Sequence, residues 1–358
     1  MRGVVDYQIG EHTMKKVSII ALVLLLLVAC SGADEVASRP TEVATSAPSP
    51  TEAVITDPTA APTASESDAT PVEMPVEEGT DSTETVPPIT ACNAFLDNTT
   101  IHCEADTAFV ESDGLPTTHD MMVGIVSWQQ QVPLPQAYTG DNAWQIPLAP
   151  ELSDNPISGA NDLFRGAIAV NGVPIFNALN NRGDDAYLAG ELDQWGGHSG
   201  RGDDYHYHIA PTHLQDIVGI DQPIAYALDG FPIYGLTEPD GSPVVGLDEY
   251  NGHFDDDGNY HYHATETYPY INGGLRGVVD YQNGQVEPQP QALPVRPAGE
   301  PLPGAEVTAF SQTGSNAYSL QYTLNNETYT VNYTVENETY TFEFIDPAGN
   351  STVETYTP

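Results

Sequence analysis

The sequence predicts a mainly β fold, a β-rich α+β arrangement in which one half-module occurs twice and a small antiparallel β-meander follows at the C-terminus. Three observations support this prediction. A pattern of residues is repeated along the chain, Asn-Gly and Asp-Gly pairs stand between short apolar runs, and residues 305–358 alternate between apolar and polar side chains. Alternation with a period of two is typical of a half-buried strand. Asn-Gly and Asp-Gly are typical of tight hairpin turns.

The repeat is the most informative feature, because self-similarity within a chain indicates repeated structural units. The first copy begins with AIAVNGVPIFN at Ala167–Asn177 and ends with LDQWGGHSGRGDDYHYH at Leu192–His208. The second begins with AYALDGFPIYG at Ala225–Gly235 and ends with LDEYNGHFDDDGNYHYH at Leu247–His263. From Leu-Asp to the final His the copies align without a gap.

Each copy is expected to begin with a β-hairpin. Asn171–Gly172 and Asp229–Gly230 separate short apolar runs, which predicts a two-residue turn in each copy. Pro174 and Pro232 follow the turns. Because proline cannot donate a hydrogen bond to a neighbouring strand, we expect the returning strands to lie at a sheet edge.

Each copy ends in Tyr-His-Tyr-His, an alternating run that predicts a strand, and we expect the two strands to be paired. Residues two apart on a strand share a face. The two His of each segment therefore project together, and the Tyr project to the opposite face. A further His lies eight residues before each segment and is expected to return on the preceding loop. The predicted metal ligands are His198, His206 and His208 in the first copy, and His253, His261 and His263 in the second.

This pattern resembles the YHYH protein family, bacterial extracytoplasmic proteins named after the motif. The resemblance also takes in VGIVSWQQQVPLPQAYTGDNAWQIPL at Val123–Leu148, ALDGFPIYG at Ala227–Gly235 and YHYHATETYPY at Tyr260–Tyr270. It extends over about 119–284. It implies a YHYH domain, which we place at 91–284, and it implies no particular reaction.

Neutral imidazole is a good ligand for transition metals, with zinc or copper the ions most expected here. Two geometries are open. Each copy can bind its own ion through three His, or the four strand His can share one ion. A third possibility is that the His and Tyr form a buried hydrogen-bonded network that is only architectural. The protein would then be a non-enzymatic envelope binding or structural module.

Other candidate residues surround the His. Asp193 and Asp248 are candidates for orienting the ligand rings. Asp255, Asp257 and Asn259 form a D-x-D-x-N run that could hold calcium, although a Tyr stands where a calcium loop needs Gly. The sequence has no G-x-S-x-G and no phosphate-binding loop with Lys. No catalytic acid, base or nucleophile is therefore predicted.

The repeat halves span about 160–210 and 218–265. The Pro-rich residues 285–304 are predicted to be an extended linker. Residues 305–358 form the predicted meander, with turn signals at Asn325–Asn326 and Glu336–Asn337. Because so few strands make only a thin core, we expect the main domain to cover its apolar face.

Composition argues against nucleic acid as a partner. The chain has nine Lys plus Arg against 51 Asp plus Glu, a formal net charge of −42. Nucleic-acid binding needs basic groups that neutralise phosphates. The excess of negative charge instead favours solubility and attracts cations.

Residues 14–30 are predicted to be a lipoprotein signal peptide. A charged start is followed by VSIIALVLLLLV, which is too short for a comfortable membrane span. Leu27–Cys30 then resembles the lipobox of bacterial lipoproteins, in which Cys30 is acylated. Two or more acyl chains give stable attachment, so the membrane is the expected partner. We therefore expect an extracytoplasmic protein anchored by lipid to the bacterial cell envelope.

The rest of the N-terminal region is not expected to be globular. Residues 1–13 contain the RGVVDYQ that recurs at Arg276–Gln282, so we interpret them as an incorrectly assigned start. Residues 31–90, rich in Thr, Ser, Pro, Ala and Glu, are predicted to be a disordered tether that forms a flexible stalk. Apart from Cys30, the cysteines are Cys92 and Cys103, an even pair that predicts a disulfide in an oxidising compartment.

Overall fold

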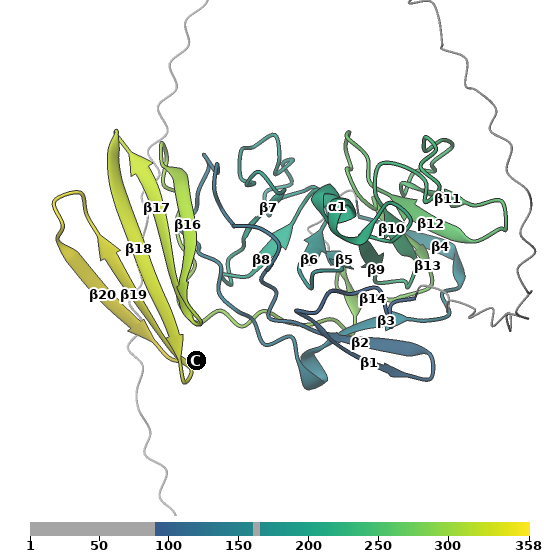
Figure 1. The fold of residues 1–358 in the computed structure, drawn as a ribbon, viewed down its shortest axis with the longest axis horizontal. Coiled ribbons are helices and arrows are strands. Elements are labelled where there is room, and N and C mark those ends of the chain that lie inside the picture. The colour runs from purple at the N-terminus through teal and green to yellow at the C-terminus, as the bar shows by residue number, and fades with distance from the viewer. Residues whose placement is uncertain (1–89, 160–164) are drawn as a thin grey trace, which may run out of the picture. The chain divides into compact units, whose positions relative to one another are not determined.

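The computed structural model describes residues 90–159 and 165–358 (Figure 1). The predicted start at 1–13, the signal peptide with Cys30, the tether up to residue 89 and the first residues of the first repeat half lie outside the described residues. The described chain is built mainly of antiparallel strands, so the mainly β prediction is confirmed. Its helical elements are α1 (Gln215–Val218) and short 3-10 turns at Gly140–Asn142 and Thr212–Leu214. None of the helices in residues 90–159 and 165–358 is long and apolar enough to cross a membrane.

The two copies of the repeat form one eight-stranded sheet with the order β11-β12-β10-β9-β5-β6-β8-β7. Equivalent strands of the two copies follow in the same order from the two ends of the sheet, because each copy contributes a hairpin and then two further strands. The copies meet at an antiparallel pairing of β5 with β9, where Ile168 lies opposite Tyr226. The strands are β5 (Arg165–Ala169), β6 (Pro174–Phe176), β7 (Gly197–Ser199), β8 (Tyr205–Tyr207), β9 (Ala225–Ala227), β10 (Pro232–Tyr234), β11 (Gly252–Phe254) and β12 (Tyr260–His263).

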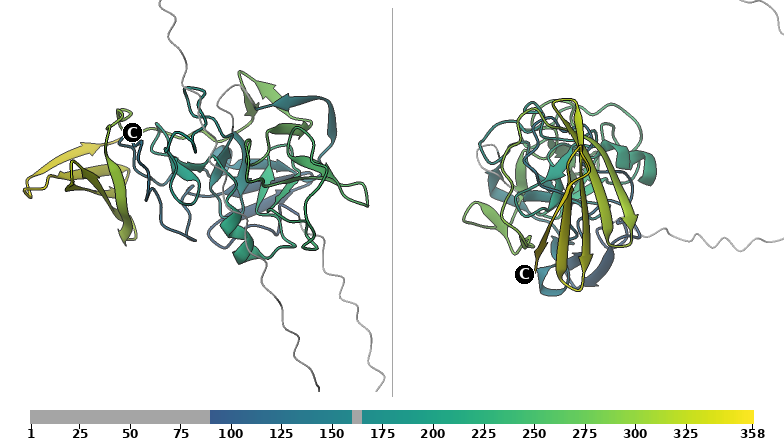
Figure 2. Two further views of the ribbon diagram at one scale, coloured as in Figure 1. Left: turned by 90° about the horizontal axis from the view of Figure 1, so that it is seen from above. Right: turned by 90° about the vertical axis from the view of Figure 1, so that its left-hand side faces the viewer.

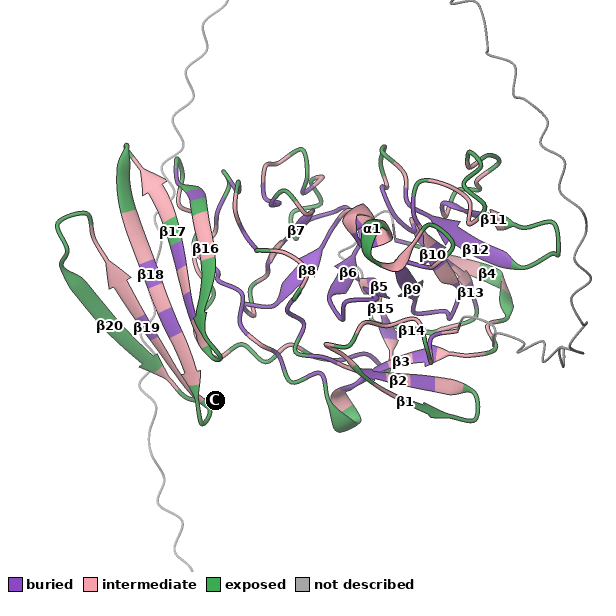
Figure 3. Ribbon diagram, in the orientation of Figure 1, coloured by how far each residue is buried: buried purple, intermediate pink, exposed green. Residues whose placement is uncertain are grey.

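The Tyr-His-Tyr-His strands β8 and β12 do not pair with each other, which corrects the prediction that they would. Strand β8 pairs with β6 and β7, and β12 pairs with β10 and β11. Strands β10, β9, β5 and β6 therefore lie between them. Five strand spacings separate β8 from β12 by roughly 24 Å. The hairpin strands β5 and β9 occupy the centre because their side chains are almost fully buried, as the buried colour in Figure 3 shows.

The hairpins themselves differ from the prediction in two details. In each copy the turn is a three-residue loop, since the amide of Ala169 donates to Val173 and that of Ala227 donates to Phe231. The glycine in third place, at φ +80° in the first copy and +94° in the second, permits this longer turn. The prolines at 174 and 232 lie on interior strands rather than edge strands, because each is the first residue of its strand.

Smaller sheets flank the central one. The first described strands form a three-stranded sheet, and two further pairs follow. A disulfide joins Cys92 to Cys103, which lies on the first strand of the three-stranded sheet. The strands are β1 (Thr100–Glu104), β2 (Thr107–Glu111) and β3 (Trp144–Pro147), then β4 (Leu152–Ser158) paired with β13 (Gly274–Gly277), and β14 (Asp280–Gln282) paired with β15 (Gln285–Glu287).

The C-terminal meander is confirmed as a five-stranded antiparallel sheet, seen from two further sides in Figure 2. Asn325 and Asn326 form its second turn, as predicted. The third turn is at Asn337 and Glu338, one residue later than predicted. The strands are β16 (Glu306–Gly314), β17 (Ala317–Leu324), β18 (Glu327–Glu336), β19 (Thr339–Ile345) and β20 (Ser351–Tyr356).

The meander contacts the rest of the domain through buried groups. The hydroxyl of Tyr333 donates to the carbonyl of Pro133 at 2.8 Å, and the amide of Gly124 donates to Val307 at 2.9 Å. Arg296, within the Pro-rich segment, pairs with the Asp203 carboxylate and lies over the Phe342 ring. The predicted linker therefore lies along the domain and is held to it by these contacts.

Candidate metal centres

The first copy brings its three predicted ligands together. His198 lies on β7 and His206 on β8, where they are direct cross-strand partners. His198 is thus on a strand and not on the predicted loop. His208 follows β8 and points to the same side as His206, as the strand period requires. One ring nitrogen from each of the three His lies within 4.8 Å of the others.

These nitrogens are the Nε2 atoms. The Nε2 of His208 lies 3.1 Å from those of His206 and His198. Each Nδ1 instead faces a backbone carbonyl: Glu191 for His198 at 3.1 Å, Asp204 for His206 at 2.9 Å and Asn177 for His208 at 2.6 Å. Because a carbonyl only accepts, each Nδ1 carries the hydrogen and each neutral ring presents a bare Nε2 lone pair. The short Nε2 contacts therefore cannot be ordinary hydrogen bonds.

The second copy repeats this arrangement and adds a carboxylate. His253 on β11 and His261 on β12 are cross-strand partners with Nε2 atoms 3.0 Å apart. Glu238 completes the group, with carboxylate oxygens 3.2 Å from Nε2 of His253, 3.5 Å from that of His261 and 3.3 Å from that of His263. The Nδ1 of His253 faces the carbonyl of Val245 and that of His263 faces Gly235. The ring of His261 is hydrogen-bonded to the backbone of Asn259.

Glu238 was missed by the sequence analysis because it lies outside the repeated motifs. It follows β10 by four residues, in the spacer between the hairpin and the Leu-Asp segment. Its only signal in the sequence is position: counted from Pro-Ile in each copy, Glu238 falls where the first copy has Asn180.

Burial disfavours the charged form of four of the ligand rings. It lowers the pKa of His198 to about 3, with the neighbouring His206 adding to the effect. It lowers the pKa of His208 well below the usual value, and also lowers the pKa of His261 and His263. Neutral imidazole is the form that ligates metals.

The donor set and its spacing fit a transition metal. A tetrahedral zinc with Zn–N bonds of about 2.0–2.1 Å separates its nitrogen ligands by about 3.3 Å. The observed separations of 3.0–3.1 Å are within a few tenths of an ångström of that value. The buried Nε2 of His263 makes no hydrogen bond among the described residues, and the group that faces it at 3.3 Å is the Glu238 carboxylate, which has no hydrogen to donate when ionised. A buried lone pair without a donor is costly, and a cation between the rings removes that cost.

A comparison with protein-family models finds the family that the Tyr-His-Tyr-His motif resembles. Residues 143–243 match the family model described as YHYH protein. The chain carries a YHYH domain. The match includes the whole first copy and the hairpin of the second, and ends before the second Tyr-His-Tyr-His strand. No curated protein and no solved structure matches the chain.

The tyrosines of the two Tyr-His-Tyr-His segments face the opposite side of the sheet, and three of the four donate to aspartates there, while Tyr207 contacts Asn171 and His119. Tyr205 donates to Asp193 at 2.7 Å, and Tyr260 donates to Asp248 at 2.9 Å. Asp193 also accepts backbone amides of the loop before β7, and Asp248 does the same before β11. These aspartates therefore hold tyrosines and loops rather than orienting ligand rings, which corrects that prediction. Backbone carbonyls orient the rings.

The Gly before the first ligand of each copy is explained by the same tyrosines. A Cβ at position 197 would lie 2.5 Å from the Tyr205 hydroxyl, and one at position 252 would lie 2.1 Å from the Tyr260 hydroxyl. Only Gly leaves space for each hydroxyl to reach its aspartate. The Gly-His and Tyr-His parts of the YHYH motif are thus one packing unit.

The predicted calcium ligands form a turn between β11 and β12. The Asp255 carboxylate accepts the amides of Asp257 and Asn259 and the side-chain amide of Asn259. Its oxygens are therefore already used as acceptors within the loop. This arrangement gives no support to the calcium prediction.

Proposed function

We propose that the chain binds two transition-metal ions, zinc or copper, one in each copy of the repeat. The observation that carries this proposal is the orientation of the rings. Carbonyls fix the Nδ1 hydrogens, and in each copy the bare Nε2 atoms converge on one point. An ion at that point satisfies all of these lone pairs together, and His-rich sets of this kind favour zinc or copper.

The architectural alternative is less well supported, because the tyrosines already perform that role. The Tyr262 hydroxyl donates to buried Asp229 at 2.6 Å and accepts the Arg276 amide at 2.7 Å. Such contacts join distant segments of the chain on the tyrosine face. On the histidine face of the first copy the Nε2 atoms have no donor between them, so without a cation their clustering is unfavourable. In the second copy the Glu238 carboxylate adds negative charge to the same cluster.

We further propose that the metal-binding domain is held outside the cell membrane by a lipid anchor. The support is the apolar run with its charged start and the Leu-Val-Ala-Cys that ends at Cys30. The Thr-, Ser- and Pro-rich residues that follow would act as a stalk.

The direct test of the function is elemental analysis. Full-length protein is purified without chelator, loaded with zinc or copper, and freed of unbound metal. Two ions per chain are expected. Failure to retain either zinc or copper under these conditions would rule out the proposal.

A further inference from the structure

The two centres occupy equivalent places but have different donors. Asn180 and Glu238 close the same turn: the amide of Gly183 donates to the Asn180 carbonyl at 3.0 Å, and that of Gly241 donates to the Glu238 carbonyl at 2.9 Å. An isolated bridge precedes each turn by one residue, at Leu179 and Thr237. The second centre therefore has a carboxylate where the first has an amide.

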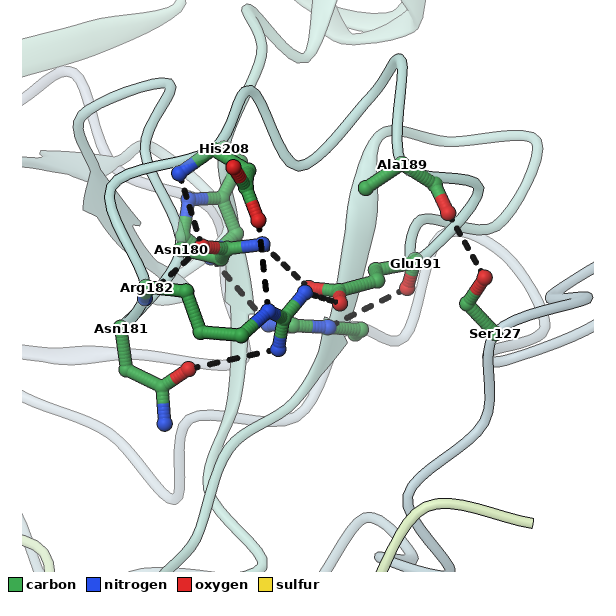
Figure 4. Close-up of polar contacts among 9 residues, drawn as sticks. Ser127, Asn180, Asn181, Arg182, Ala189, Glu191 and His208 are labelled. Carbon is green, nitrogen blue, oxygen red and sulfur yellow. Dashed lines mark hydrogen bonds and ion pairs between the residues drawn. The ribbon is translucent and has the colours of Figure 1, made fainter. Parts of the chain in front are cut away.

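The Asn180 amide is directed to other partners, as Figure 4 shows. Its nitrogen donates to the Glu191 carboxylate at 3.2 Å, and its oxygen accepts the amides of Arg182 and Asp184. Glu191 is buried and is also paired with the Arg182 guanidinium. Among the described residues, the candidate group in the first copy is therefore limited to three His. A metal with three protein ligands keeps one position open.

A pocket of about 310 Å³ adjoins the open side of the first centre. All three His line it, together with Phe176, the arginines Arg165 and Arg201, and the acidic residues Glu191 and Asp204. Phe176 stacks on the His206 ring at 3.9 Å, and the Arg165 guanidinium lies over Phe176 at 5.2 Å. The volume is in the range of small-molecule sites.

This pocket is less acidic than the groove beside the second centre, because its two arginines balance its two acidic residues. Arg201 is exposed and has no hydrogen-bond or ion-pair partner among residues 90–159 and 165–358. In the gapless alignment of the copies it falls where the second copy has Asp256. The groove of about 820 Å³ beside the second centre has no basic residue in its described lining. Its acidic residues are Glu238, Asp240, Asp248, Asp255, Asp256 and Asp257.

We propose that the pocket of the first centre binds a small molecule with a carboxylate or phosphate group. This inference rests on the proposed metal binding. One oxygen of the anion occupies the open position on the ion, a second oxygen pairs with Arg201, and the body of the molecule packs against Phe176. Arginine suits this role because its planar guanidinium recognises carboxylate and phosphate oxygens. In the second centre, Glu238 fills the position and the acidic groove repels anions.

The test uses full-length protein loaded with Co²⁺, whose visible absorption reports its ligands. Acetate and inorganic phosphate are titrated separately, and their relative affinities show which oxyanion the pocket prefers. His263→Ala leaves the first centre intact, and His208→Ala leaves the second. A saturable spectral change is expected in wild type and in His263→Ala, and no change in His208→Ala. Arg201→Asp, which installs the charge of the second copy, is expected to weaken anion binding at least tenfold while two ions remain bound.

The outcomes separate this inference from the metal proposal. Two bound ions with no response to either anion, or an equal response from His208→Ala, overturn the inference alone. Unchanged anion affinity in Arg201→Asp also overturns it. Failure to bind any of Co²⁺, zinc and copper overturns both proposals. If His208→Ala does not fold, His198→Ala provides a second variant: it removes another ligand of the first centre and is expected to abolish the anion response while the second ion remains bound.

Discussion

The Nε2 of His208 lies 3.1 Å from the Nε2 of His198, and neither atom carries a hydrogen because both Nδ1 atoms face carbonyls. Two lone pairs at this distance repel each other in a buried site. The second copy also has a short Nε2 contact, because His253 and His261 are cross-strand partners on β11 and β12 and their Nε2 atoms lie 3.0 Å apart. A cation is the simplest group that converts this repulsion into binding.

If the two metal centres are separate, removing a ligand from one centre should leave the ion of the other centre bound. His208→Ala is expected to lower the zinc content from two ions per chain to one, and His263→Ala is expected to do the same, because each removes a ligand of one copy only. His102→Ala is a matched control, since that ring is exposed and contacts Glu104. Elemental analysis of the folded variants measures the effect. Loss of both ions from either variant would instead indicate a shared site.

The tyrosine face predicts a loss of stability without a loss of metal. Tyr262→Phe leaves the buried Asp229 carboxylate and the Arg276 amide without their hydroxyl partner. The free energy of unfolding is expected to fall by about 1–3 kcal/mol. Urea denaturation with metal analysis checks both parts, and Tyr268→Phe, at a half-exposed position, is the control. A variant of unchanged stability that binds one ion fewer would show that the tyrosine supports the centre instead.

The glycine of the motif predicts a steric effect. In Gly252→Ala the new methyl group meets the Tyr260 ring and hydroxyl, and the expected cost is about 1–3 kcal/mol. The clash is local, so Gly252→Ala combined with Tyr260→Leu is expected to lose less stability than the sum of the single variants. Thermal or urea unfolding of the four proteins gives the coupling. Simple additivity would mean that the two residues do not constrain each other.

The buried histidines predict that the metal-free protein loses stability as pH falls from about 7 to about 6. The pKa of His198 is lowered to about 3 by burial, against about 6.5 in an unfolded chain. The unfolded state therefore binds more protons in this window, and the stability that is present above about 6.5 decreases below it. Urea unfolding after chelator treatment, compared with His198→Ala, measures this contribution.

Carboxylates oppose this effect at lower pH. Burial raises the pKa of Asp193 and of Asp229 to about 6, so these groups bind protons more readily in the folded state and favour it as pH falls below that value. The window above pH 6 therefore isolates the histidines. A constant stability from pH 7 to 6, or an equal slope in His198→Ala, would contradict their neutral, buried state.

The strand histidines of both centres were predictable because the strand period puts His206 beside His208 and His261 beside His263. The hairpins and the meander were predictable for the same kind of local reason. Turn residues and alternating side chains act over a few positions, and the fold preserves these local preferences.

What could not be predicted depends on contacts between distant segments. The strand order was beyond local patterns, so Pro174 was expected at an edge and instead begins an interior strand. Asp193 was expected beside a ring, but it lies on the tyrosine face, where its carboxylate accepts a hydroxyl and backbone amides. Glu238 reaches the second centre from a spacer that carries no motif. In each case the deciding information is which strand neighbours which.

The most direct test of two separate centres is X-ray diffraction at the zinc absorption edge from crystals of the zinc-loaded protein. The account predicts two anomalous peaks per chain, one between the Nε2 atoms of the first-copy ligands and one between those of the second copy and the Glu238 carboxylate. A single peak shared by the copies, or peaks only at other residues, would contradict it.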